Sequence, residues 1–140
     1  MSGAKRILLV SRDVMVLQTR KLMLGAYFEV HVAGRVIEAK KLLGERRFDL
    51  IVLCYTLTED DCEKIIDSAR DCCPQAKFLV LTGMGFAAKQ VSIRPHYLSA
   101  DEGPFFLVKK AAELLGYEFR SKGRMVRIPP PELIAASPSA

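Results

Sequence analysis

Short runs of consecutive apolar residues recur along this chain, and longer segments with apolar residues at every third or fourth position separate them. The run from Ile7 to Val10 is entirely aliphatic, and the run from Phe48 to Leu53 is interrupted only by Asp49. Such runs are typical of strands that are buried on both faces of a parallel sheet. We expect strands at residues 6–10, 28–32, 48–53, 78–81 and 97–98.

The segment after the first strand predicts a helix. Asp13 is suited to cap its start, and Gly25 marks its end. Three apolar pairs recur seven positions apart and predict the buried face, which leaves residues 18–21 for water. These pairs are Met15 and Leu22, Val16 and Met23, and Leu17 and Leu24.

Further helices are expected in three of the remaining intervals between and after the strands. They run from Val36 to about Gly44, from Thr58 to just before Pro74, and from Pro104 to about Leu115. The interval 83–95 has the weakest pattern, with glycines at its start and a proline at its end, and predicts a short or irregular helix. Regular alternation of strands and helices indicates the α/β class, a three-layer, doubly wound, five-stranded parallel sheet.

Composition and charge exclude several classes of protein. The 140 residues suffice for one domain, and no apolar run is long enough to span a membrane. The apolar run near the N-terminus is too short for a secretory signal, so we expect a cytoplasmic protein with reduced thiols. The four cysteines form no CxxC pair and have no histidine at zinc-finger spacing, so no metal site is expected.

Positive charge is in excess by five but is spread along the chain. Residues from 117 onward contribute two of these charges, through Arg120, Lys122, Arg124 and Arg127 against two glutamates. A surface of mixed sign explains this distribution better than a nucleic-acid footprint, so a nucleic-acid partner is not expected. We expect one domain at residues 1–116, followed at 117–140 by a basic arm, either a hairpin or extended, and a proline-rich tail.

The carboxyl ends of the strands are the place to seek chemistry, since ligands of doubly wound sheets gather there. The turn after the first strand, Ser11-Arg12-Asp13, has no glycine, so it lacks the fingerprint of a dinucleotide-binding or P-loop protein. The corresponding positions after the later strands are 54–56, 82–83 and 99–102.

The chain resembles, in the order and spacing of its strands, the receiver domain of bacterial two-component response regulators. The matching segments are the strands at 7–10, 48–53 and 79–83, the aromatic Tyr97 and the leucine-rich last helix. The resemblance covers about residues 5–116. It implies a flavodoxin-like (CheY-like) fold with strand order 2-1-3-4-5, and a signalling module in place of an enzyme.

The same resemblance identifies five site positions, and this sequence departs from the family at four of them. Ser11 and Arg12 stand where an acidic pair would bind Mg²⁺, Cys54 stands at the phospho-acceptor aspartate, and Ala100 stands at the lysine. Thr82 keeps the hydroxyl. Without the acceptor and the magnesium ligands, aspartyl phosphorylation and a metal cofactor are not expected. Thr82 and Tyr97 remain a possible hydroxyl-aromatic switch by this resemblance.

Two side chains at the altered site leave alternatives open. Arg12 either pairs with Asp101 or Glu102 or points to water, and Cys54 is either a redox-sensing thiol or a small buried residue. We therefore expect a degenerate receiver domain of a phosphorelay system, a phosphorylation-independent interaction module. It would bind a kinase-like or regulatory protein, or a second copy, through about residues 86–115. The alternative is a regulatory protein that binds nucleic acid or senses redox state through Cys54.

Overall fold

The computed structural model describes residues 5–82, 97–100, 104–120 and 124–127. The interval 83–95, where a short or irregular helix is predicted, lies outside these residues, as do Asp101, Glu102 and the proline-rich tail. Among the described helices, none combines the length and the apolar character that a membrane crossing requires.

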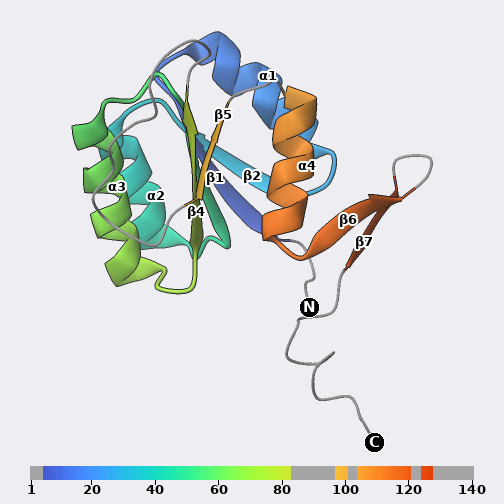
Figure 1. The fold of residues 1–140 in the computed structure, drawn as a ribbon. Helices are drawn as coiled ribbons and strands as arrows, with labels where there is room; N and C mark the ends of the chain where they lie inside the picture. Colours follow the sequence, from blue (N-terminus) through green and yellow to red (C-terminus); the bar gives the residue numbers. More distant parts are fainter. Residues whose placement is uncertain (1–4, 83–96, 101–103, 121–123, 128–140) are drawn as a thin grey trace, which may run out of the picture.

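Five parallel strands form the central sheet, in the order β2-β1-β3-β4-β5 (Figure 1). This is the expected strand order, and it is confirmed. The strands are β1 (Arg6–Val10), β2 (Glu29–Ala33), β3 (Leu50–Leu53), β4 (Lys77–Thr82) and β5 (Tyr97–Ala100). Because β1, β3 and β4 have a neighbour on each side and helices on both faces, their apolar residues are almost completely buried.

Within the described residues four helices cover the sheet, two on each face, so the three-layer prediction is also confirmed (Figure 1). They are α1 (Val14–Gly25), α2 (Val36–Glu45), α3 (Glu59–Cys72) and α4 (Pro104–Leu114). Helices α1 and α4 pack on one face of the sheet, and α2 and α3 pack on the other. Alternate residues of each central strand supply the two cores, because successive side chains of a strand point to opposite faces.

The buried face of α1 differs from the prediction. Leu17, Arg20 and Leu24 are buried, whereas Met15 is 69% exposed and Leu22 is 79% exposed. A straight helix turns by about 100° per residue, so one contact with the sheet and α4 covers only positions three, four and seven apart. Three parallel rows satisfy the recurrence at seven positions. Only the row of Leu17 and Leu24 is buried along its length, while Val16 of a second row is partly buried against the same core.

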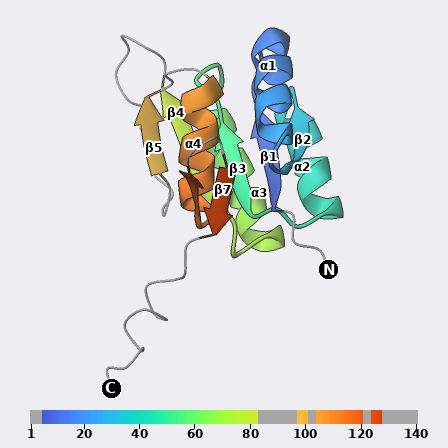
Figure 2. The same cartoon turned by 90° about the vertical axis from the view of Figure 1, so that its right-hand side faces the viewer.

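The described residues after α4 form two antiparallel strands, at 117–120 and 124–127, as the hairpin alternative predicts. Gly116, with φ of 87°, turns the chain after α4, and β6 (Tyr117–Arg120) then pairs with β7 (Arg124–Arg127). The Tyr117 ring packs edge-on against Phe28 at a centroid distance of 6.2 Å, which anchors the base of β6. Figure 1 shows this two-stranded arm apart from the main sheet, and in Figure 2 the arm lies in front of the domain.

The first prediction concerns the start of α1. The Asp13 carboxylate accepts hydrogen bonds from the backbone N–H groups of Met15 and Val16, at 2.9 and 3.3 Å. Asp13→Ala should lower the free energy of unfolding by about 1 kcal/mol, because two N–H groups lose their acceptor. Asp13→Asn keeps an acceptor and should cost much less. Urea denaturation compares the two variants, and equal losses would contradict the capping role.

Candidate functional site

The carboxyl edge of the sheet brings four of the five sequence-predicted site positions onto neighbouring strands. Ser11 follows β1 and Cys54 follows β3, and the Cys54 N–H donates to the Val10 carbonyl at 3.0 Å. Thr82 ends β4 and pairs in register with Ala100 of β5. The backbone thus gathers these positions along one edge, and Arg12 stands next to Ser11.

A cluster of hydroxyl and backbone hydrogen bonds joins the loop after β1 to the loop after β3. Ser11 is fully buried, and its Oγ lies 2.9 Å from the Oγ1 atom of Thr56. The same Thr56 Oγ1 accepts from the Arg12 N–H at 2.9 Å, and the Asp13 N–H donates to Ser11 Oγ at 3.1 Å. Thr56 belongs to the 54–56 stretch that was identified after the third strand, but no role was assigned to it there. A buried, neutral serine with these partners is a structural link between the two loops.

Arg12 forms an ion pair that sequence reasoning did not identify. Its Nε and Nη2 atoms donate to the same Oδ2 atom of Asp61 at 3.0 and 2.9 Å. The Arg12 side chain is 52% exposed and that of Asp61 only 9% exposed, so the carboxylate is the buried partner. The expectation that Arg12 points to water is therefore wrong, while its proposed partners, Asp101 and Glu102, lie outside the described residues.

Asp61 also belongs to the first turn of α3. The Thr58 N–H donates to Asp61 Oδ2 at 3.1 Å, and the Asp61 N–H donates to Thr58 Oγ1 at 3.0 Å. This reciprocal capping box also holds the carboxylate to which Arg12 binds. The signal was present in the sequence, since Thr58 and Asp61 have the S/T-x-x-D/E spacing that precedes many helices.

The electrostatics of this pair favour an ionised carboxylate. Burial raises the pKa of Asp61, but hydrogen bonds from the Thr58 N–H and the Arg12 guanidinium outweigh it and hold the pKa below its ordinary value. The site therefore contains its own cation, a guanidinium, bound to a carboxylate from α3. A guanidinium offers only donors and cannot ligate a metal ion, so Arg12 cannot replace a magnesium-binding carboxylate.

Cys54 is fully buried, and its side chain belongs to the core shared with α1 and α4. Its carbonyl accepts from the Leu57 N–H at 3.1 Å, which closes the turn after β3. These contacts favour the small buried residue over the redox-sensing thiol, since a reactive cysteine needs access to solvent. Cys62 on α3 and Cys73, directly after α3, are buried as well, in the opposite core.

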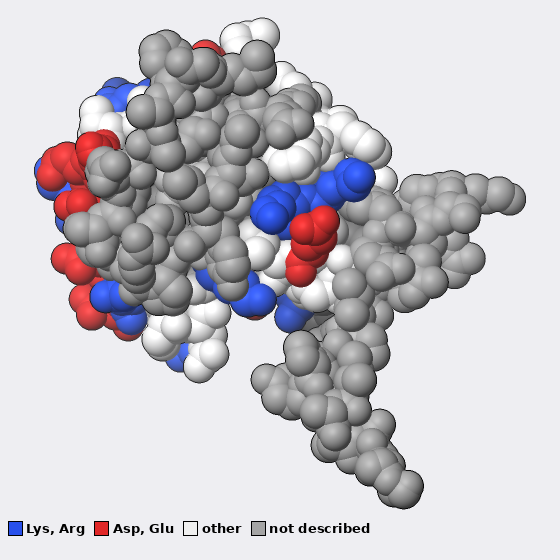
Figure 3. Space-filling model, viewed as in Figure 1, with Lys and Arg blue, Asp and Glu red and all other residues white. Residues whose placement is uncertain are grey.

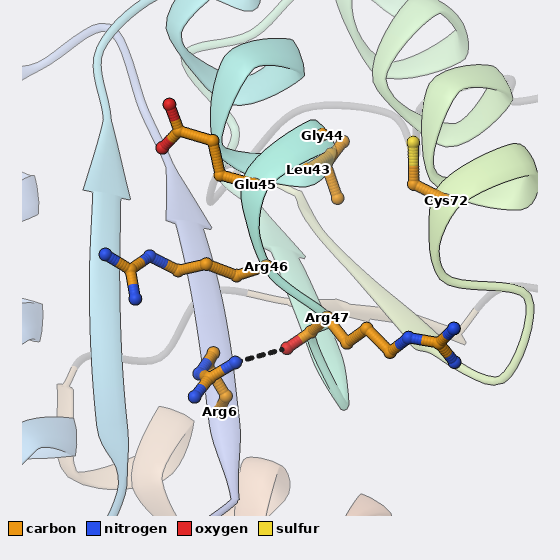
Figure 4. A pocket seen from close by; sticks show the side chains of 7 residues that line it. All are labelled: Arg6, Leu43, Gly44, Glu45, Arg46, Arg47 and Cys72. Atoms are coloured by element: carbon orange, nitrogen blue, oxygen red, sulfur yellow. Dashed lines mark hydrogen bonds between the residues drawn. The ribbon is translucent and has the colours of Figure 1, made fainter.

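The described residues include no group of three or more His, Cys, Asp or Glu side chains arranged to hold a metal ion. A depression does exist at the opposite, amino-terminal edge of the sheet, lined by Arg6, Arg46, Arg47 and Cys72 among others (Figure 4). Arg6 Nη1 donates to the Arg47 carbonyl at 3.2 Å, while the side chains of Arg46 and Arg47 extend in different directions. These arginines do not converge on one ligand position.

The second prediction concerns the pair of Arg12 and Asp61. A double-mutant cycle with Arg12→Ala and Asp61→Asn should give a coupling of about 0.5–1 kcal/mol at neutral pH, because Arg12 is half exposed and partly screened by water. Asn keeps an oxygen for the cap and removes the charge. Asp61→Ala should cost about 1 kcal/mol more than Asp61→Asn, because it also removes the cap.

The pH dependence of that coupling follows from the lowered pKa of Asp61. The stabilisation is fully present above the unfolded-state value of about 3.9 and is lost as the pH falls through the lower folded-state value. Urea denaturation at about pH 7 and at a series of lower pH values down to about pH 2 follows this loss. A coupling that persists unchanged in acid would show that charge is not its source.

No family model and no curated protein matches this chain. Several solved structures do match this chain. A CheY-like response regulator receiver domain protein from Methanospirillum hungatei has a TM-score of 0.67 and 24% identity, with 81% of this chain and 94% of that chain covered. A response regulator from Burkholderia pseudomallei, described with a phosphorylated aspartic acid, has a TM-score of 0.59 and 23% identity, with coverage of 79% and 71%.

A structure of an adenylate cyclase from Rhodopirellula baltica also matches, with 30% identity and a TM-score of 0.53. That match covers 59% of this chain and 62% of the cyclase chain, so it concerns only part of each protein. The receiver structures agree with the parallel sheet, the strand order and the two helical layers described above. This chain therefore has the fold of CheY-like response regulator receiver domains.

Proposed function

We propose that this chain is a degenerate receiver domain of a two-component signalling system that acts in the cytoplasm as a phosphorylation-independent interaction module. It is proposed to be a binding protein and not an enzyme. The observation that carries the proposal is the ion pair between Arg12 and Asp61. It occupies the loop where the receiver resemblance would require a magnesium-binding carboxylate.

The chemistry of phosphoryl transfer explains why this pair matters. Transfer to a carboxylate needs a nucleophile, a cation that neutralises the transferring oxygens, and oriented hydrogen-bond donors. Cys54 provides no carboxylate, and its thiol lies in the apolar core. Arg12 brings positive charge, but Asp61 already neutralises it, and Ser11 is a neutral, buried hydroxyl.

The same contacts hold the loops in place, as a bound metal ion and phosphoryl group would otherwise do. The hydrogen bond between Ser11 and Thr56 connects the β1–α1 loop to the segment between β3 and α3, and the ion pair between Arg12 and Asp61 connects it to the first turn of α3. Such links hold the loops in one arrangement without a ligand. A signal would then enter through a bound protein, since the site itself needs no charge change to be ordered.

The partner is proposed to be a kinase-like or regulatory protein, or a second copy, bound through about residues 86–115. Of this segment, the structure describes α4 and the strand β5. Phe105, in the first turn of α4, is 65% exposed, and an aromatic side chain in this position supports a protein contact. The switch through Thr82 and Tyr97 stays a prediction. Redox sensing through Cys54 is not proposed, because Cys54 is buried.

The third prediction tests the proposal directly. Incubation with acetyl phosphate and Mg²⁺ should leave the mass of the protein unchanged, because no acceptor carboxylate follows β3. Intact-mass spectrometry of a fresh sample measures the result, with an active receiver domain as the positive control. A hydroxylamine-labile phosphoryl adduct on this chain would refute phosphorylation independence.

Variants at the acceptor position test the role of Arg12 in the same assay. Cys54→Asp alone should remain unlabelled, because Ser11 and Arg12 still deny Mg²⁺ its ligands. The matched comparison is Cys54→Asp combined with Arg12→Asp, which removes the guanidinium and adds a carboxylate. Strong Mg²⁺-dependent labelling of the single variant would show that Arg12 is no obstacle to phosphoryl transfer.

A further inference from the structure

Helix α1 has an outward face that is apolar and carries little charge. Val14, Met15 and Leu22 on this helix are 62%, 69% and 79% exposed. Lys21 is the one charged residue among the exposed positions of α1, and in Figure 3 the surface visible beside α1 is largely white. Exposed apolar side chains that gather on one helix are typical of a surface that contacts another segment of protein.

The C-terminal half of this face contains a hollow. A depression of about 620 Å³ is lined by Gln18, Lys21, Leu22, Gly25 and Ala26. At Gly25 a Cβ atom would meet nothing within 4 Å, so the space above this residue is open. The lining offers apolar groups, one amide and one ammonium group. It therefore suits a short apolar segment with one negative charge beside it.

The two-stranded arm begins next to the end of α1 that contains the hollow. Helix α1 leads into the start of β2, and Lys77 Nζ, at the start of β4, donates to the Leu114 carbonyl at the end of α4 at 2.7 Å. Both helices thus end at the amino-terminal edge of the sheet, where the arm follows α4 (Figure 1). There the Tyr117 ring packs against Phe28, whose N–H donates to the Leu24 carbonyl in the last turn of α1 at 2.9 Å.

The chain also leaves the arm at this place. Arg127, the last residue of β7, pairs with Tyr117, the first residue of β6. Paired residues of antiparallel strands have Cα atoms about 4.5–5.5 Å apart. The segment 128–140 therefore starts beside Tyr117, whose ring contacts Phe28. The six residues from Arg127 to Leu133 span at most about 20 Å, which is enough to reach the hollow from the base of the arm.

The sequence of this last segment complements the hollow. Three prolines, at 129–131, come first, and consecutive prolines favour an extended spacer. The one acidic residue of the segment, Glu132, directly precedes its one pair of adjacent large aliphatic residues, Leu133 and Ile134. An acidic group beside two aliphatic side chains matches a hollow that has apolar groups beside the ammonium group of Lys21.

We propose that residues 132–136 of the same chain dock on the outward face of α1, with Leu133 and Ile134 in the hollow and Glu132 beside Lys21. The small area of this face favours a tethered occupant over a separate molecule. A helix of 12 residues is about 18 Å long and offers less than the roughly 800 Å² per partner of a standard interface. A tethered segment needs less area, because a short linker gives it an effective concentration on the order of mM.

Docking would make this segment a cover for the face of α1. A protein that binds the same face must first displace residues 132–136, so its apparent affinity falls by the fraction of molecules in which the face is free. The inference goes beyond the proposed function, which places the partner at about residues 86–115. It does not depend on phosphorylation independence.

The fourth prediction is tested by paramagnetic relaxation enhancement in the full chain. The chain carries a nitroxide label on Ser137→Cys, in a Cys72→Ser background that removes the exposed native thiol. The amide signals of residues 18–26 should lose at least half of their intensity, because a dissociation constant below the effective concentration makes the docked state the majority. The amide signals of α2 and α3, on the opposite face of the sheet, should keep theirs. Intact signals at residues 18–26 would overturn the proposal.

Matched variants separate docking from the mere proximity of a tethered label. Leu22→Asp places a carboxylate in the hollow and should lower the ratio of docked to free molecules at least fivefold, so the broadening of residues 18–26 decreases. Ile37→Asp on α2 carries the same change of charge at a site that is 72% exposed and outside the face, and it should leave the broadening unchanged. Leu133→Ser combined with Ile134→Ser should repeat the effect of Leu22→Asp.

Broadening that survives both Leu22→Asp and the paired serine substitutions would contradict docking in the hollow. The amide spectrum of each variant shows directly whether the domain is still folded. A mixed sample tests for a second copy as the occupant: spin-labelled chains without isotope are added to isotope-labelled chains without a spin label. Residues 18–26 should then show no selective broadening, and selective broadening would assign the face to a second copy and overturn the proposal. None of these measurements involves phosphodonors, so failure here is distinguishable from failure of the labelling experiment.

Discussion

The burial of β1 and β3 on both faces is the constraint on which the rest of the structure depends. These strands pair in parallel, with Ile7 opposite Leu50 and Val10 opposite Leu53, and each of these residues is fully buried. Each large aliphatic side chain that is removed from water contributes roughly 1.5–3 kcal/mol. The carboxyl ends of both strands must therefore meet at one edge, whatever residues happen to follow them.

Because of that constraint, the first polar residues after the two strands lie next to one another, and those that are buried need hydrogen-bond partners inside the protein. Ser11 comes directly after Val10 and is still fully buried, so its hydroxyl needs a hydrogen-bond partner inside the protein. Thr56 supplies it and also accepts from the Arg12 N–H. The contacts between the two loops thus follow from the burial of the sheet. The ion pair between Arg12 and Asp61 is a further contact of the same β1–α1 loop, and sheet burial alone does not require it.

The parts of this molecule that local patterns determine could be predicted from the sequence. The apolar runs around Leu8 and Ile51 gave the central strands, and Asp13 gave the start of α1, because each depends on a few adjacent residues. The orientation of α1 could not be predicted, since three apolar rows competed for one contact with the sheet and α4. Arg20 is buried although charge alone would place it in water.

The partner of Arg12 was missed for a related reason. Sequence spacing offered Asp101 and Glu102, which follow another strand end, whereas the actual partner lies 49 residues away in the first turn of α3. The capping box between Thr58 and Asp61 was recognisable, but its use as an anchor for a guanidinium depends on how close α3 packs to the end of β1. Tertiary geometry decides such pairs.

A guanidinium and a metal ion differ in how they can take part in signalling. A divalent cation binds and leaves, so a site that uses one can have two states of charge. Arg12 is covalently part of the chain and permanently protonated, and Asp61, with its lowered pKa, stays ionised at neutral pH. The pair therefore has a single charge state under physiological conditions. A change of state in this molecule must therefore arise outside this pair, either at the predicted switch of Thr82 and Tyr97 or through contacts at the surface.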